Sequence, residues 1–408
     1  MKRTLITNIG MLATPQGTSA RGGRAQGEIC ILKNAWILIE NDLIAQVGNG
    51  AAPAAADAQT INAGGKLVTP GLVDAHTHLI FGGWRQNELA LKLHGAGYLD
   101  ILAAGGGILS TMRATQSASE EQLEAKASAA LDEMLRFGTT TAEAKSGYGL
   151  STGEECKALR VIGNLQKHHV MDLAATFMGA HAVPETYRDN RQGYLELLCE
   201  EMLPAVREQG IAEFCDVFCE KGVFSAEESR RILLTGRQYG LRPKIHADEI
   251  EAIGGSELAG EIGAVSAEHL IVCPPSGIAS MARGGAVACC LPATSFYLGA
   301  AYAPVQDMVQ AGVPVAMATD FNPGSCPCLN MQLVISLGCL RYRLTPEQAL
   351  TAVTLNGAAA ICRADRIGSI EPGKQADILI WNAEDLDYIC YRLGSNLVDT
   401  VIKKGNVV

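Results

Sequence analysis

Most histidines of this sequence stand where they could act on one ion. The chain has eight histidines, and five of them follow short apolar runs: His76, His78, His181, His246 and His269. Asp320 follows another apolar run, in the segment 317–324. Imidazole and carboxylate groups both bind divalent transition metals. The pattern therefore raises the hypothesis of a metal site.

The pair His76-Thr77-His78 gives this hypothesis a geometric basis. Residues i and i+2 of an extended strand point to the same side, so both imidazoles could reach one ion. Alone, such a pair is as readily a polar strand end. Together with His246 and Asp320 it predicts a four-ligand site for Zn²⁺ or Fe²⁺. Cys326 and Cys328 follow closely, but free cysteines are commonly packing residues.

Two further residues are candidates for proton transfer and carbonyl activation. Glu249 follows His246 by three residues and could move protons between a metal-bound water and a leaving nitrogen. Asp248 competes with it for this role. His269 could be a fifth ligand, a group that polarises a scissile carbonyl, or a satisfied core histidine.

Arg85 and Tyr148 are candidates for contact with a substrate. Arg85 lies seven residues after His78, and a guanidinium can hold a carboxylate through two hydrogen bonds. It could equally be a solvated loop charge. Tyr148 stands between Gly147 and Gly149, which suits a substrate-contacting turn or an ordinary one.

Composition limits the class of protein. The 408 residues carry 33 Lys plus Arg against 43 Asp plus Glu, a net charge of −10, and 48% are hydrophobic. This composition is globular, and its acidic balance argues against nucleic acid or anionic membranes as partners. No segment reaches the roughly 18 apolar residues of a membrane span, and a signal peptide is not expected. Thirteen scattered cysteines indicate a reduced, cytoplasmic protein.

The middle of the chain alternates apolar strands with amphipathic helices. Near-continuous apolar runs are typical of parallel strands buried on both faces, and eight are expected, at residues 72–76, 139–144, 172–178, 212–218, 243–246, 264–269, 286–291 and 313–319. Capping boxes at Ser225/Glu228 and Thr345/Gln348 predict helix starts. The pattern favours a (β/α)₈ barrel, with its chemistry at the carboxyl ends of the strands.

Both ends of the chain have a different character. Residues 1–66 and 365–408 contain short strand-like runs separated by Gly and Ala-Pro turns. We therefore predict one small β-sandwich domain built from residues 1–66 and 365–408, and a barrel domain over residues 67–364.

Several motifs resemble the amidohydrolase superfamily over essentially the whole chain. They are PGLVDAHTH at 70–78, the late Asp320 and GSIEPGKQAD at 368–377. Within the superfamily, HLIFGGWR at 78–85, EAKSGYGL at 143–150 and DFNPGS at 320–325 resemble the imidazolonepropionases. The resemblance implies a distorted (β/α)₈ barrel with a β-sandwich domain.

The resemblance also implies an activity and site roles. The reaction would be hydrolysis of 4-imidazolone-5-propanoate, an anionic small molecule, to N-formimino-L-glutamate in histidine degradation. One Zn²⁺ or Fe²⁺ would bind His76, His78, His246 and Asp320, with Glu249, His269 and Asp320 catalytic. The substrate contacts would be Arg85, Tyr98, Tyr148, His181, Asn322, Gly324 and Ser325. A homodimer is also implied.

Three alternatives stay open. Some relatives carry a carboxylated lysine on an early strand, so Lys145 could support a second metal. Another cyclic amidohydrolase or a deaminase of guanine or cytosine would use the same ligands without the anchor Arg85. A binding module that has lost catalysis would lack the ligands, all four of which are present here.

Overall fold

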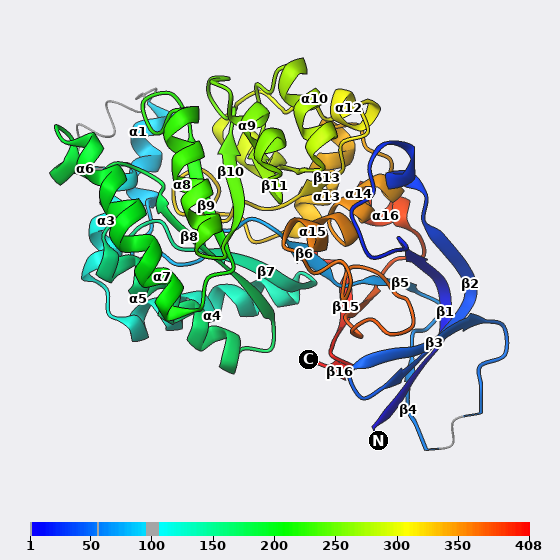
Figure 1. Cartoon of the computed structure of the whole chain (residues 1–408). Coiled ribbons are helices and arrows are strands. Elements are labelled where there is room, and N and C mark those ends of the chain that lie inside the picture. Colours follow the sequence, from blue (N-terminus) through cyan, green and yellow to red (C-terminus); the bar gives the residue numbers. More distant parts are fainter. Residues whose placement is uncertain (1, 55–56, 95–105) are drawn as a thin grey trace.

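The computed structural model describes residues 2–54, 57–94 and 106–408. Strands in this part of the chain form two eight-stranded sheets, one surrounded by helices and one at the side of the molecule (Figure 1). The first sheet is made by the middle of the chain, and the second combines its two ends.

The first sheet is a parallel barrel whose strands follow one another in chain order. They are β6 (Leu72–Asp74), β7 (Thr139–Lys145), β8 (Asp172–Ala180), β9 (Phe214–Cys219), β10 (Arg242–Ala247), β11 (Ser266–His269), β12 (Val287–Cys290) and β13 (Val315–Met317). Almost all their residues are buried, as parallel strands covered on both faces must be. Each overlaps a predicted strand, so the barrel prediction is confirmed.

The barrel closes just beyond the ends of its first and last strands. Thr77 and Phe321 form an isolated parallel bridge. The His78 N–H donates to the Phe321 carbonyl at 2.9 Å, and the Asp320 N–H donates to the His76 carbonyl at 3.0 Å. The seam therefore places two His residues and one Asp residue of the predicted metal site beside one another.

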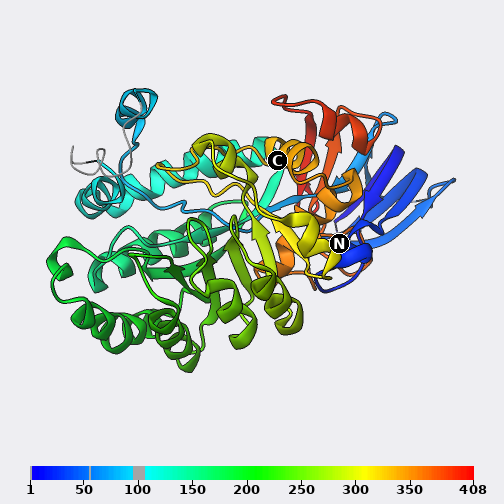
Figure 2. The same ribbon diagram turned by 90° about the horizontal axis from the view of Figure 1, so that it is seen from above.

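Helices cover the outside of the barrel and connect its strands (Figures 1 and 2). The longer ones are α3 (Ile108–Ser117), α4 (Glu120–Arg136), α5 (Thr152–His168), α8 (Ala226–Gln238), α9 (Gly255–Ile262), α10 (Pro275–Gly284) and α13 (Met331–Arg341). The shorter ones are α1 (Leu89–Leu93), α6 (Arg191–Glu196), α7 (Leu203–Gln209), α11 (Pro292–Leu298), α12 (Val305–Gln310), α14 (Pro346–Ala352), α15 (Leu355–Ala360) and α16 (Leu386–Tyr391). Both predicted capping boxes form, at α8 and α14.

Short helical turns complete the connections. Three are 3₁₀ turns, η1 (Gly23–Gly27), η2 (Gln86–Glu88) and η3 (Glu185–Tyr187), and a π-helical turn, η4 (Leu197–Met202), joins α6 to α7. None of the helices in the described ranges combines the length and apolarity needed to cross a lipid bilayer.

The second sheet joins both ends of the chain, as predicted. Its strands are β1 (Arg3–Thr14), β2 (Cys30–Glu40), β3 (Leu43–Asn49), β4 (Gln59–Asn62), β5 (Leu67–Pro70), β14 (Ile378–Trp381), β15 (Val398–Lys403) and β16 (Asn406–Val407). Antiparallel pairing of β5 with β14 joins the two ends into one sheet. Since β5 lies in this sheet, the barrel's strands begin at Leu72. The domain limits at 66/67 and 364/365 stay a prediction.

A charged cluster joins the two sheets. Asp172 begins β8 of the barrel, and its carboxylate accepts from Lys403 at 2.8 Å and Lys404 at 2.6 Å, at the end of β15. Lys403 also donates to Asp377 at 2.7 Å. The Lys403 side chain is fully buried, so its charge needs these carboxylates.

Candidate metal-binding active site

Four side-chain atoms converge at the carboxyl end of the barrel. The Asp320 Oδ1 atom lies 3.5 Å from His76 Nε2 and 3.6 Å from His78 Nε2. The Nε2 atoms of His78 and His246 lie 3.3 Å apart. All four residues are buried. The structure thus brings together the four residues for which the sequence predicts metal ligation.

The chemistry of this group fits a divalent cation. Burial, above all, lowers the pKa of His76 and His78 well below the usual range and that of His246 to about 3, so the imidazoles are neutral at physiological pH. Among the described residues, neither ring nitrogen of His76 has a hydrogen-bond partner. Buried polar nitrogens are rarely left without one. Three neutral nitrogens and one carboxylate are a ligand set for Zn²⁺ or Fe²⁺.

A carboxylate behind the site orients His246. Asp216, on β9, lies with Oδ2 3.0 Å from His246 Nδ1, which leaves Nε2 facing His78. Such outer carboxylates fix the ring orientation of a metal-binding histidine. Asp216 was not among the residues predicted from the sequence, although an acid inside the apolar strand Phe214–Cys219 is a usable signal.

A hydroxyl group orients the fourth ligand in a similar way. Thr294, in α11, donates from Oγ1 to Asp320 Oδ2 at 2.7 Å. This contact leaves Asp320 Oδ1 directed to the histidines. Asp320 also has a φ of 58° and His269 a φ of 68°, a conformation that non-glycine residues adopt at a cost and that gathers at functional sites.

The surroundings of Lys145 argue against a carboxylated lysine. Its Nζ lies 2.7 Å from Asp216 and 2.8 Å from Glu143, and all three side chains are fully buried. Burial lowers the pKa of Lys145, but the neighbouring carboxylates outweigh it and raise this pKa above the usual range. The amine therefore stays protonated and has no lone pair with which to bind carbon dioxide.

Glu249 and His269 lie next to the four converging residues. His269, His76 and Asp320 form a second group of close ligand atoms, and Glu249 Oε2 lies 3.6 Å from His269 Nε2. Burial, with the charge of Glu220, raises the pKa of Glu249 to about 7. The competing acid Asp248 lies instead beside Ser256 of α9, so the geometry favours Glu249.

Tyr148 and His181 form one wall beside the metal ligands. The His181 ring stacks on His78, with centroids 4.9 Å apart and planes inclined by 21°. The Tyr148 ring lies 5.1 Å from His181. Burial raises the pKa of Tyr148 and lowers that of His181 to about 4, so both rings are neutral at physiological pH.

Arg85 meets the loop after β13. A Cβ atom added to Gly324 would lie 2.2 Å from Arg85 Nη1, so this glycine makes room for the guanidinium. Asn322 shapes the same loop, because its Oδ1 accepts from the N–H groups of Gly324 and Ser325 at 2.8 and 2.7 Å. Arg85, Asn322, Gly324 and Ser325 are therefore neighbours, as expected of a shared binding surface.

A pair with Glu88 limits how the Arg85 guanidinium could hold a carboxylate. Its Nε and Nη2 atoms each donate to the buried Glu88 carboxylate at 2.9 Å. A carboxylate ligand therefore cannot take that side edge of the guanidinium. The end edge, formed by Nη1 and the second Nη2 hydrogen, takes no part in this pair with Glu88.

Comparisons with known proteins agree with this fold. The model of the amidohydrolase family matches residues 67–408. The chain belongs to the amidohydrolase family. It is 50% identical to the imidazolonepropionase of Alkaliphilus metalliredigens, with 100% of this chain and 98% of that protein covered. The imidazolonepropionase of Bacillus cereus (strain G9842) is 48% identical, with 100% and 97% covered.

Solved structures support the amidohydrolase fold at low sequence identity. Escherichia coli guanine deaminase superposes with a TM-score of 0.75 at 16% identity, covering 100% of this chain and 99% of that chain. A zinc-bound adenosine deaminase from Xanthomonas campestris gives a TM-score of 0.70 at 20% identity, with 99% and 92% covered.

One predicted substrate contact and the two cysteines near Asp320 remain to be placed. Tyr98 lies outside the described residues. Cys326 is buried beside Cys328, and the groups of potential metal ligands in the described ranges contain no cysteine.

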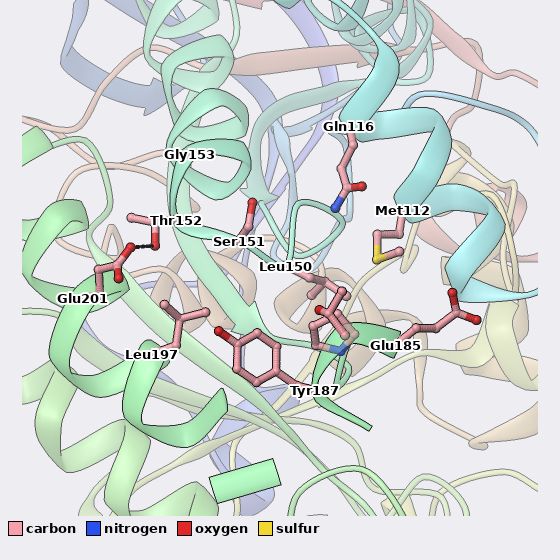
Figure 3. Close-up of a pocket in the computed structure, with 12 residues that line it drawn as sticks. Met112, Gln116, Leu150, Ser151, Thr152, Gly153, Glu185, Tyr187, Leu197 and Glu201 are labelled. Carbon is pink, nitrogen blue, oxygen red and sulfur yellow. Dashed lines mark hydrogen bonds between the residues drawn. The ribbon is translucent and has the colours of Figure 1, made fainter. Parts of the chain in front are cut away.

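An open cavity of about 560 Å³ lies at the start of α5, between residues of α3, the turn before α5 and the segment Pro184–Tyr187 (Figure 3). Met112 of α3, Leu150 and Tyr187 are among its lining residues, and Thr152 donates to Glu201 across one side. None of the candidate site residues is part of its described lining. The cavity adjoins the turn between β7 and α5, which includes Tyr148, because Leu150 lines it. It is separate from the four potential metal ligands.

Proposed function

We propose that the chain hydrolyses the ring amide of 4-imidazolone-5-propanoate to N-formimino-L-glutamate, the third step of histidine degradation. One observation carries the proposal: the four potential metal ligands and the guanidinium of Arg85 meet at the loop Asp320–Ser325. The full-length similarity to imidazolonepropionases supports the same substrate. The chain's net charge is −10, so an anionic substrate needs such a local anchor.

We propose that His76, His78, His246 and Asp320 hold one Zn²⁺ or Fe²⁺. Zinc in the adenosine deaminase that shares the fold supports a metal of this type, and the protonated Lys145 supports a single ion. When bound, the ion would lower the pKa of water towards about 7 and polarise the scissile carbonyl.

The protein's own groups would then handle protons and charge. Glu249, with a pKa raised to about 7, can accept and donate a proton at neutral pH and would protonate the leaving ring nitrogen. Asp320 would share the proton transfer. His269 would donate a hydrogen bond to the developing oxyanion.

Substrate contacts follow from the neighbours of Arg85. The end edge of its guanidinium would hold the propanoate group, and Tyr98, Tyr148, His181, Asn322, Gly324 and Ser325 would contact the rest of the molecule. We also propose that the enzyme works in the cytoplasm as a homodimer.

The test is hydrolysis of freshly generated 4-imidazolone-5-propanoate, followed by loss of its ultraviolet absorbance, with the metal content assayed. His246→Ala should abolish turnover. Arg85→Ala should lower kcat/KM by about 10- to 150-fold, since a hydrogen bond between charged groups contributes about 1.5–3 kcal/mol. Arg24→Ala is the matched control, because Arg24 is 95% exposed.

The outcomes separate enzyme class from substrate. No turnover by a protein holding about one metal per chain would reject this substrate, and the fold's deaminases would make purine and pyrimidine rings the next candidates. Normal turnover by Arg85→Ala would reject the anchor.

A further inference from the structure

A buried carboxylate outside the proposed catalytic groups organises the turn that carries Tyr148. Glu155, in the first turn of α5, is fully buried. Its Oε2 accepts from the Gly147 N–H at 3.0 Å, and its Oε1 accepts from the N–H groups of Gly149 and Leu150, both at 2.8 Å. The Ser146 hydroxyl also bonds to it.

These donors are uncharged, and most of them are backbone N–H groups. The carboxylate therefore holds the backbone of the turn. Hydrogen bonds to an ionised acceptor are stronger than those between neutral groups. The turn they hold has an unfavourable backbone, with φ of 115° at Gly147 and 54° at Leu150. The conformation of the turn between β7 and α5 therefore depends on Glu155.

The same turn fixes a ring beside the metal ligands. The Gly147 carbonyl accepts from His181 Nδ1 at 2.9 Å. A carbonyl oxygen only accepts, so Nδ1 carries the hydrogen, and the neutral ring keeps its lone pair on Nε2. Gly147 thus links the two side chains. Its N–H donates to Glu155, and its C=O accepts from His181.

We propose that Glu155 is a positioning residue that fixes the tautomer and orientation of His181 through Gly147, and the place of Tyr148 through Gly149 and Leu150. This inference rests on the proposed function, in which His181 and Tyr148 contact the substrate. Its chemical consequence is specificity. With Nε2 held as an acceptor, His181 selects a ring that presents an N–H group.

Glu155→Gln tests this proposal because the change is isosteric. The glutamine oxygen can still accept from Gly149 and Leu150, but the amide nitrogen then faces the Gly147 N–H, donor against donor. We expect the Gly147 peptide to turn away and kcat/KM to fall about 10- to 100-fold. Glu154→Gln is the matched control, since Glu154 is the preceding residue, partly exposed and paired with Lys157, and should leave kcat/KM within twofold.

A second readout does not depend on the substrate. In zinc-loaded protein with ¹⁵N-labelled histidine, NMR spectra report the tautomer of each ring. The Nδ1–H signal of His181 should be present in the wild type and in Glu154→Gln and lost in Glu155→Gln. An unchanged tautomer in Glu155→Gln, or unchanged kcat/KM, would overturn the proposal.

The two proposals fail in different ways. A wild type that does not hydrolyse the substrate but loses the His181 signal on Glu155→Gln would reject the function and keep the positioning role. If Glu155→Gln does not fold, Glu155→Asp replaces it in a double-mutant cycle with His181→Ala. The effect of Glu155→Asp on kcat/KM must shrink in that background, and strictly additive effects would overturn the inference.

Discussion

Asp216 links the metal site to the charged interior of the barrel, so its replacement should have two separable effects. Its Oδ2 lies 3.0 Å from His246 Nδ1 and 2.7 Å from Lys145 Nζ. Asp216→Asn keeps the shape of the side chain and removes its charge. His246 then loses the partner that orients its ring, and Lys145 loses one of its two ion pairs and keeps the one with Glu143.

The two losses can be estimated from the contacts. Mutation of an outer partner of a metal-binding histidine lowers metal affinity by about 10- to 100-fold, which is about 1.4–2.7 kcal/mol. Breaking a buried ion pair costs about 3–5 kcal/mol of stability. Unfolding entropy of about 2.1 cal/mol/K per residue over the 408 residues converts this to a fall of about 4–6 °C in the Tm of the metal-free protein.

Zinc affinity would be measured by competition with a chromogenic chelator, and Tm by thermal unfolding in the presence of a strong chelator. Glu143→Gln is the matched control. Glu143 is equally buried and lies 2.8 Å from both Lys145 and Lys244, so its variant should lose stability and keep zinc affinity. Wild-type affinity in Asp216→Asn, or an equal loss in Glu143→Gln, would refute the argument that Asp216 acts through His246.

Three further outcomes are expected. Burial favours a higher pKa for Asp172, but Lys403 and Lys404 hold this pKa at about 2 against an ordinary 3.8. The contribution of Asp172 to stability is therefore full above about pH 4 and lost towards pH 2. Between pH 5 and pH 3 the urea midpoint of the wild type should fall more than that of Asp172→Asn, and equal falls would contradict this. Gly324→Ala should raise KM about tenfold and also lower Tm by a few degrees, because the new Cβ would lie 2.2 Å from Arg85 Nη1 and would push the guanidinium out of its pair with the buried Glu88. Steady-state kinetics and melting curves check this, and an unchanged KM would show that the displaced guanidinium does not bind substrate. Removing the metal with a chelator should abolish turnover and lower Tm, since ligand binding stabilises the folded state. Added Zn²⁺ or Fe²⁺ should restore turnover and Tm. Full activity in verified metal-free protein would reject the metal site.

Much of the fold could be predicted because the signals are local. Strands buried on both faces must be apolar along their whole length, so the runs ending near His76, His246 and His269 were visible in the sequence. The ends of neighbouring parallel strands meet on one face of a barrel. Ligand candidates could therefore be chosen by their place after a strand.

The terminal sheet was harder to delimit from the sequence. Residues 67–70 read as the start of the barrel, but β5 pairs with β14 over 300 residues away in the chain. Residues 1–66 read as short strand-like runs, whereas β1 spans Arg3–Thr14 and β2 runs without a break from Cys30 to Glu40. Pairing partners decide such boundaries, and a single strand's pattern does not contain them.

The sequence by itself determined which residue types could bind a metal and at which strand ends they stand. The tertiary structure alone decided which carboxylates contact the candidate site residues and the turn beside them. Asp216 reaches His246, Glu88 occupies the side edge of Arg85, and Glu155 shapes the turn that holds His181. The physical reason is that a buried carboxylate must find its donors wherever the fold places them. Strand periodicity fixes which face a side chain lies on, but only the closed barrel sets distances between strands.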